Sequence, residues 1–180
     1  MSNEYEFYQV GQSMELTVPE TYKHETYLSE FRKLTRSYKA LYMSDDITPT
    51  KYPQASQHLV PGMHLRVSVI GVKTSSPVRI SKCIKYLIAE GAVFTNMHGL
   101  LLVFRECPDL FVPGFAYHGL DFPEMLPPDS VDTGKGILRK GYRHPVVSVP
   151  PIGRAFPRSI SHSLTEKIGP LTRFLKFELI

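Results

Sequence analysis

Long apolar runs and cysteine are both scarce in this sequence. No apolar run approaches the roughly 20 residues that a helix needs to cross a bilayer. The first 18 residues carry acidic side chains where a signal peptide carries basic ones, and they lack its apolar core. We therefore expect a protein of the cytosol or nucleus. In that compartment the only two cysteines, Cys83 and Cys107, are expected to be reduced and buried, with a disulfide between them as the alternative.

Catalytic and metal-binding signatures are also missing. None of the seven histidines sits in an HxxxH or HExxH pattern, and the cysteines form no CxxC pair, although zinc sites usually include one close ligand pair. No nucleophile elbow, P-loop or dinucleotide-binding glycine motif is present. We therefore predict a protein that is not an enzyme and has no catalytic residues, no metal site and no cofactor. A small enzyme built on Cys107 and a histidine remains as an alternative, because partners in Cys–His sites meet in space rather than in sequence.

The composition is that of one folded domain. The chain has 180 residues, of which 42% are apolar and 21% are charged. A chain of this length can bury a real core, and this balance argues against wholesale disorder. We predict an α+β fold: a single compact domain, with an antiparallel sheet flanked by two to three helices and a long Pro-rich loop. The domain is expected to span residues 14–180, and residues 1–13 are expected to form a mobile arm.

The densest structural signal lies in the middle of the chain. Apolar and polar residues alternate over 63–70, which predicts a strand. The sequence Ser75-Ser76-Pro77 is typical of a helix start. An apolar stripe over 79–90 predicts the helix itself, which is expected to end at Gly91. The five apolar residues Leu100–Phe104 then fit a buried central strand.

Five further elements follow from the same kinds of pattern. Apolar residues recur at spacings of three and four within 21–43, which predicts a helix that either packs on the core or docks in a partner's groove. Alternation predicts strands over 14–18, 146–149 and 171–180. Apolar residues spaced by four predict a short helix over 160–168.

Two long segments have no regular period. Residues 44–60 contain proline and many turn formers, so we expect an exposed, protease-sensitive loop. Residues 107–134 are rich in both proline and aromatic residues, and prolines at this density break any regular central element. The aromatic side chains of this second loop either pack on the fold or present an apolar patch for self-association. The residues assigned to that patch are Phe111, Phe115, Tyr117 and Phe122.

Positive charge is concentrated in the last quarter of the chain. Residues 135–180 hold nine Lys/Arg against two Asp/Glu. This asymmetry indicates an anionic partner, with a solvated basic face as the alternative. The residues expected to bind the partner lie in the basic region 135–158 and are Lys135, Arg139, Lys140, Arg143, Arg154 and Arg158. Tyr142 and Phe156 lie among them and suit base stacking, but the same charges also suit anionic lipid.

The central block resembles the matrix proteins of rhabdovirus-like negative-strand RNA viruses, in particular the short ones of plant-infecting members. The shared pattern covers residues 61–106 and consists of the strand Leu65–Val69, the turn Ser75–Pro77, the helix Arg79–Glu90 and the apolar run Leu100–Phe104. The resemblance implies a compact α+β protein that self-associates, binds the viral nucleocapsid and binds anionic membrane peripherally. It also implies a place in the virion and the host cytoplasm.

The chain departs from many such proteins in two respects. It has no PPxY or PTAP motif, and its basic residues lie near the C-terminal rather than the N-terminal end. The first departure puts budding through the usual recruited machinery in doubt. The second means that residues 135–158 would have to supply the contacts to nucleocapsid or lipid. We therefore predict a non-enzymatic viral structural protein of matrix type, with a sequence-tolerant RNA- or DNA-binding accessory protein as the alternative.

Overall fold

The computed structural model describes most of the 180-residue chain. The described residues are 6–37, 43–45, 47–52, 55–73, 77–122, 125–126, 128–132, 138–152, 155–162 and 167–180. Among them the helices are α1 (His24–Ser37), α2 (Ile80–Ala89), α3 (Asn96–Glu106) and a short 3-10 helix, η2 (Pro108–Leu110). The strands are β1 (Phe7–Thr17), β2 (His64–Val72), β3 (Val78–Arg79), β4 (Phe115–His118), β5 (Pro128–Asp132), β6 (Leu138–Val149), β7 (Phe156–His162), β8 (Lys167–Ile168) and β9 (Thr172–Leu179).

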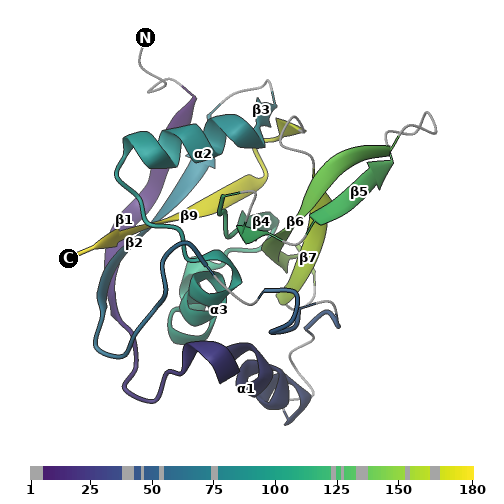
Figure 1. Ribbon diagram of the computed structural model, residues 1–180. Helices are drawn as coiled ribbons and strands as arrows, with labels where there is room; N and C mark the ends of the chain where they lie inside the picture. Colours follow the sequence, from purple (N-terminus) through teal and green to yellow (C-terminus); the bar gives the residue numbers. More distant parts are fainter. Residues whose placement is uncertain are drawn as a thin grey trace.

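Seven of the strands form one sheet, in which β9 has an interior position. The strand order is β1-β2-β9-β4-β6-β5, and β7 pairs with β6 (Figure 1). All of these pairs are antiparallel except β4 with β9, which is parallel. β3 and β8 form a separate two-stranded ladder. The predicted α+β class, with one compact domain and a mainly antiparallel sheet flanked by helices, is confirmed.

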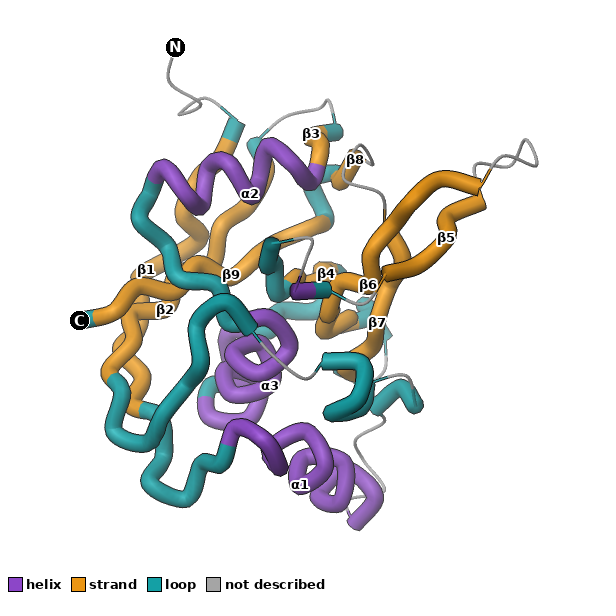
Figure 2. The backbone as a smooth tube through the Cα atoms, viewed as in Figure 1, coloured by secondary structure: helices purple, strands orange, loops and turns teal. Residues whose placement is uncertain are grey.

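The helices cover both faces of the sheet (Figure 2). On β2, Val67 and Val69 belong to one apolar cluster with α3, whereas Ile70 and Val72 belong to a second cluster with α2. Successive residues of a strand point to opposite faces, so this alternation puts α3 and α2 on opposite sides. We name these sides the α3 face and the α2 face. Within the described part of the chain, no helix combines the length and the apolar composition that a membrane span requires.

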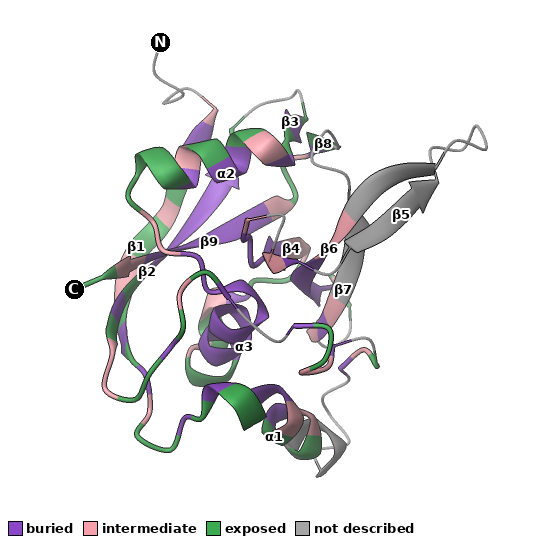
Figure 3. Cartoon of the chain, viewed as in Figure 1, coloured by how far each residue is buried: buried purple, intermediate pink, exposed green. Residues whose placement is uncertain are grey.

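Helix α3 occupies the position where a central strand was predicted. Every residue from Asn96 to Phe104 is buried, and Figure 3 shows most of the helix in the buried class. A helix enclosed on all sides needs no polar stripe, so its sequence shows a short apolar run rather than a clear helical period. The strand prediction for Leu100–Phe104 is therefore wrong. Gly99 permits the close packing, because a side chain there would collide with Thr95 and meet the ring of Phe177.

Strand β1 begins well before the short strand predicted at 14–18. Phe7 pairs opposite Val72 of β2, and the pairing continues to Thr17 with an irregularity between Val10 and Met14. Phe7 is also buried, at 3% exposure, in the cluster on the α2 face. The mobile arm predicted over residues 1–13 is therefore wrong from Phe7 onward, because this segment forms an outer strand of the sheet. Residues 1–5 lie outside the described part of the chain.

The segment 44–60 is irregular, as predicted, and it is exposed only in part. Its described residues contain no helix or strand, yet Ile47 and Tyr52 are completely buried and Leu59 is 1% exposed. All three join the apolar cluster on the α3 face. The expectation of an exposed loop holds for polar residues such as Lys51. It is wrong for these three apolar residues, because turn formers determine the backbone path and not the direction of the apolar side chains between them.

Two helix predictions need correction. The Ser75–Pro77 start is wrong because Val78 and Arg79 first form β3, and α2 begins at Ile80 with Arg79 as its N-cap residue. The predicted helix over 160–168 is also wrong: the described residues there belong to β7, which pairs with β6, and to β8, which pairs with β3. Apolar residues spaced by four also satisfy the two-residue period of a strand, which explains the error.

The remaining element predictions are confirmed. α1 lies within 21–43, β2 and β9 coincide with the alternating segments, and the strand predicted at 146–149 is the end of the longer β6. α2 ends at Ala89, and Gly91 follows its C-cap residue Glu90 with a φ of +67°, the left-handed conformation that glycine adopts without strain. The Pro-rich segment 107–134 is not one long loop, because η2, β4 and β5 all lie within it.

The substitution Leu101→Ala tests the buried helix. Leu101 in α3 is completely buried, whereas Ile88 in α2 is 50% exposed. Removing a buried leucine side chain costs about 2–5 kcal/mol, because transfer free energy is lost and a cavity remains. We expect urea denaturation to show a loss of that size for Leu101→Ala, and a loss below about 1 kcal/mol for the control Ile88→Ala. Equal losses in the two variants would contradict the buried position of α3.

Candidate functional site

Four of the six predicted basic residues lie on one pair of strands. Arg139, Lys140 and Arg143 are on β6, and Arg158 is on β7, which pairs with β6. Lys135 and Arg154 lie outside the described residues. Arg143 and Arg158 are partly exposed, and the β5–β6 hairpin projects away from the helices (Figure 1). We call Arg139, Lys140, Arg143 and Arg158 the β6–β7 basic residues.

Strand β5 places negative charge beside part of this set. Asp129 pairs opposite Gly141, and Asp132 pairs opposite Leu138. The hairpin of β5 and β6 therefore carries both signs of charge. Arg158 differs, since among the described residues no carboxylate forms an ion pair with it. The unneutralised positive charge thus extends toward β7.

The aromatic residues assigned to self-association lie at different depths. Phe111 is 7% exposed and Tyr117 is completely buried, and their ring centroids are 4.8 Å apart. The alternative that the aromatic side chains pack on the fold is confirmed for these two residues. Their assignment to a self-association patch is wrong, because other parts of the same chain cover them. Phe115 and Phe122 are partly exposed. Phe122 packs against Phe94, with 4.7 Å between the ring centroids.

Arg173 on β9 holds Phe115 and Tyr117 in place. It is 9% exposed, and its guanidinium carbon lies 3.5 Å from the centroid of the Phe115 ring. Its Nη1 donates a hydrogen bond of 2.9 Å to the Tyr117 hydroxyl, which also accepts one of 2.9 Å from the Val112 N–H. No described carboxylate pairs with Arg173, so aromatic ring faces and a hydroxyl oxygen take the place of a counter-ion. The sequence pattern had placed Arg173 on a strand without indicating this role.

A pocket of about 350 Å³ opens on the α2 face, where β4, β6, β7 and β9 lie side by side. Its floor is formed by four residues that pair across neighbouring strands. Thr172 lies opposite Ala116, Ala116 opposite Ser148, and Ser148 opposite Phe156. Its other lining residues are Gly114, Phe115, Val149, Pro150, Pro151, Arg158 and Leu171. We call it the Ser148–Arg158 pocket. It brings together one residue from each predicted set, Arg158 and Phe115.

The buried polar groups of this pocket are donors without acceptors. Ser148 is 8% exposed, and its Oγ is buried without a hydrogen-bond partner. The Nε of Arg158 is likewise buried and unpartnered, and the guanidinium carbon lies 5.6 Å from the centroid of the Phe156 ring. No aspartate or glutamate is among the described lining residues. Because unpaired buried donors are rare in folded proteins, this arrangement suits an anionic group that accepts from both.

The two cysteines form neither a disulfide nor an activated nucleophile. Both are free thiols, so the disulfide alternative is wrong. Burial raises the pKa of the Cys83 thiol to about 12. Burial, and then the adjacent Glu106 carboxylate, raise the pKa of Cys107. Thiols with raised pKa values are protonated at neutral pH and are poor nucleophiles. Among the described residues no group of three His, Cys, Asp or Glu side chains has an arrangement that could hold a metal ion.

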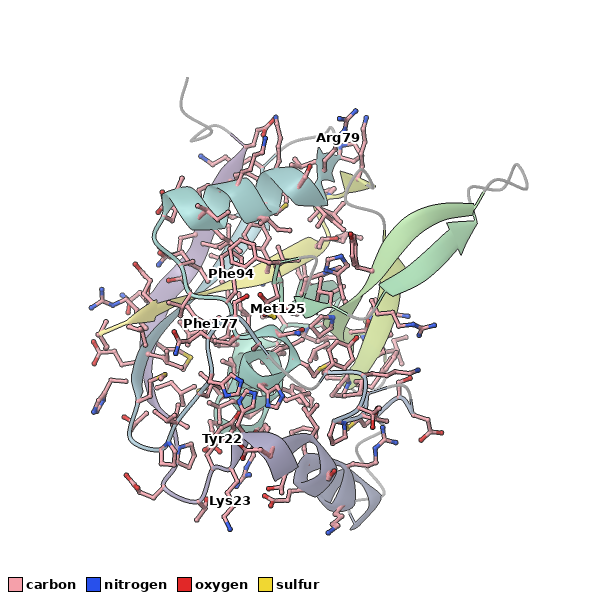
Figure 4. All side chains as sticks on the ribbon, in the orientation of Figure 1. Tyr22, Lys23, Arg79, Phe94, Met125 and Phe177 are labelled. Carbon is pink, nitrogen blue, oxygen red and sulfur yellow. The ribbon has the colours of Figure 1, made fainter. Side chains whose placement is uncertain are left out.

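Three histidines from distant parts of the chain stack on one another beside α3. The ring centroids of His24 and His98 are 3.8 Å apart, and those of His24 and His58 are 4.0 Å apart. The Tyr22 hydroxyl lies 3.1 Å from Nδ1 of both His24 and His98, between α3 and the start of α1 (Figure 4). This histidine stack, which no sequence spacing reveals, ties α1 and the segment 55–63 to α3.

Burial keeps two members of the histidine stack neutral. It lowers the pKa of His24 to about 4, with His58 acting in the same direction and Glu25 in the opposite one. Burial lowers the pKa of His98 to about 3, with His24 adding to the effect and the Tyr52 carbonyl opposing it. The nearby Tyr22 and Tyr27 remain neutral hydroxyls, because burial raises their pKa values.

Acid should therefore destabilise the fold through the histidine stack. The unfolded chain binds protons at the ordinary histidine pKa of 6.5, whereas folded His24 and His98 do not. The contribution to stability is fully present above about pH 6.5, and the unfolding free energy slopes downward as the pH drops toward about 4. Urea denaturation at a series of pH values measures this slope.

Two variants separate this effect from general acid sensitivity. His98→Gln removes one titrating ring, so we expect a shallower loss of unfolding free energy between pH 6.5 and 4 than in the parent protein. His64 on β2 is exposed, so His64→Gln should leave the slope unchanged. Identical slopes in all three proteins would show that the stack does not control the acid response.

Tyr117→Phe tests whether Tyr117 is structural. The substitution removes the acceptor of the hydrogen bonds from Arg173 and Val112. A buried donor left without a partner costs about 1–3 kcal/mol, so urea denaturation should show a loss of that size. Tyr8 is 38% exposed, and the control Tyr8→Phe should change stability by less than about 0.5 kcal/mol. A loss in Tyr117→Phe no larger than in the control would argue against the Arg173 contact.

Similarity to other proteins adds no functional assignment. Scans against protein-family models, curated proteins and solved structures found no match to this chain. The candidate site is therefore defined by its geometry alone, as an open pocket with two unpartnered donors next to the β6–β7 basic residues.

Proposed function

We propose that this chain is a non-enzymatic structural protein of matrix type, which docks on a nucleocapsid through the β6–β7 basic residues and self-associates. In this proposal it acts in the virion and the host cytoplasm. The observation that carries the proposal is the placement of Arg139, Lys140 and Arg143 on β6 beside Arg158 on β7. A nucleocapsid presents nucleic-acid phosphates or acidic protein side chains, and both attract such a set.

Two features of the molecule support a docking role. The β5–β6 hairpin projects from the body, so a partner of large size can approach it without contacting the helices (Figure 1). The second feature is that Arg158 has no carboxylate partner among the described residues, so a partner's anionic group need not displace an internal one. Phosphate contacts of this kind give affinity without sequence specificity, as a nucleocapsid coat requires.

Self-association is the second part of the proposal. With Phe111 and Tyr117 buried, the aromatic residues left to contribute are Phe115 and Phe122, which are partly exposed. Sedimentation of the full chain at low and high salt tests this part. A concentration-dependent oligomer supports it, and a strict monomer under all conditions would exclude it.

The triple variant Arg139→Ala, Lys140→Ala, Arg143→Ala tests the docking surface. A mixed-sequence single-stranded RNA 20-mer, followed by fluorescence anisotropy between 50 and 300 mM salt, serves as the probe. Each lost phosphate contact lowers the slope of log K against log salt by about 0.7, so we expect a slope shallower by about 2 and binding at least about tenfold weaker at low salt. The parent and variant are first compared by circular dichroism to establish equal folding.

A matched control removes the same charge elsewhere. Lys51, Lys73 and Lys85 are exposed and lie outside β6 and β7, so the variant in which all three become Ala should bind as the parent does. Equal weakening in both triple variants would indicate a response to net charge alone and would exclude a localised docking surface. Binding to vesicles with anionic lipid, without binding to RNA or nucleocapsid, would instead assign the charges to a membrane.

A further inference from the structure

We propose that the Ser148–Arg158 pocket binds one nucleotide of a single-stranded nucleic acid, with its phosphate on Arg158 and Ser148 and its base against Phe156. This inference rests on the proposed function and adds a partner of defined chemistry to it. It concerns a pocket on the α2 face rather than the projecting hairpin, and it involves Ser148 and Phe156, which contribute nothing to net charge.

The anion-binding half of the pocket consists of the two unpartnered donors. Ser148 on β6 pairs opposite Phe156, and Arg158 lies two residues further along β7. Diagonal neighbours of this kind are about 7–8 Å apart, within reach of a long side chain, so both donors can serve one group. Their buried donor atoms, Ser148 Oγ and Arg158 Nε, have no hydrogen-bond partner among the described residues. A phosphate accepts hydrogen bonds from an arginine and a hydroxyl at once, which would satisfy both.

The base-binding half of the pocket is apolar and aromatic. The Phe156 ring is partly exposed on the floor, and Pro150, Pro151 and Leu171 add apolar surface. Leu171 is 64% exposed, so this side of the pocket is open to a ligand. A base stacks on an aromatic ring without regard to sequence, and an arginine side chain over the same ring can contribute as well.

The size and surroundings of the pocket favour a single nucleotide over other anions. A volume of about 350 Å³ lies at the lower end for sites that hold one small organic ligand. A duplex keeps its bases stacked inside and cannot present one to Phe156.

Binding of a short oligonucleotide by pocket variants tests this inference. The probe is a fluorescein-labelled single-stranded DNA 10-mer of mixed sequence, titrated with the full chain, and a duplex of the same length is titrated in parallel. We expect Phe156→Leu to weaken single-strand binding by about fivefold or more and to leave duplex binding unchanged. Ser148→Ala should weaken it as well, and Arg158→Gln should also reduce the salt slope by about 0.7.

The control is Tyr8→Leu, which removes an aromatic ring that is 38% exposed and lies outside the pocket, and this variant should bind as the parent does. If all three pocket variants bind as the parent does while the β6 triple variant is weakened, the pocket inference is overturned and the proposed function stands. If neither the pocket variants nor the triple variant change binding, both are overturned. Equal loss of single-strand and duplex binding in Phe156→Leu would also overturn base stacking.

A second measurement covers the case in which Phe156→Leu fails to fold. The parent protein is photocrosslinked to the same 10-mer carrying one 4-thiothymidine, and the adducts are mapped by mass spectrometry. We expect adducts on the pocket residues, Phe156 above all. Adducts confined to other parts of the chain would overturn the inference without any need for a variant.

Discussion

Burial of α3 against one face of the sheet is the packing interaction on which the other elements depend. Its residues Asn96–Phe104 are all buried, so the helix must be covered by the sheet, by α1 and by the segment 43–63 together. Exposing the apolar side chains of such a helix would cost about 25 cal/mol per Å² of apolar surface. The histidine stack lies in the same contact and supplies the polar part of it, and the rings of its members His24 and His98 remain uncharged.

Two arginines on neighbouring parts of the sheet show how one chemical group takes two roles. Arg173 and Arg158 both lack a described carboxylate partner, and in both the Nε is buried. Arg173 is enclosed by Phe115 and Tyr117 and donates to a hydroxyl, so its charge is stabilised within the chain. Arg158 lines an open pocket, and its guanidinium carbon lies 5.6 Å from the centroid of the Phe156 ring. The difference in enclosure, rather than in charge, distinguishes a structural arginine from a candidate for binding.

The sequence predicts those elements that have one buried and one exposed side. α2 is of this kind, and its period determines both its type and its position. β2 and β9 are largely buried on both faces, but the alternation in their sequences still predicts strands. Leu100–Phe104 has no exposed side, so a buried helix and a buried strand give the same short apolar run. β1 was missed before residue 14 because its position follows from pairing with β2, some 60 residues away, and not from a local period.

The residues of the candidate site likewise differ in whether the sequence predicts them. Arg158 and Phe115 could be predicted because charge and aromaticity are visible residue by residue. Ser148 could not, because its importance depends on the register that puts it between Ala116 and Phe156. The histidine stack depends on three segments meeting in space, and Tyr22 links two of them only after the chain has folded. Spacing in the sequence carries no information about either arrangement.

The position of β9 in the sheet has a consequence for how the chain folds. β9 is the latest strand in the sequence, yet it is the one that joins β2 to β4, so the strands on its two sides have no other ladder between them. Until it is in place, β2 and β4 each present an unpaired edge, which invites association with other chains. The Ser148–Arg158 pocket also takes Leu171 and Thr172 from the start of this strand. A ligand of that pocket would therefore bind the fully folded chain but not a chain in which β9 is still unpaired.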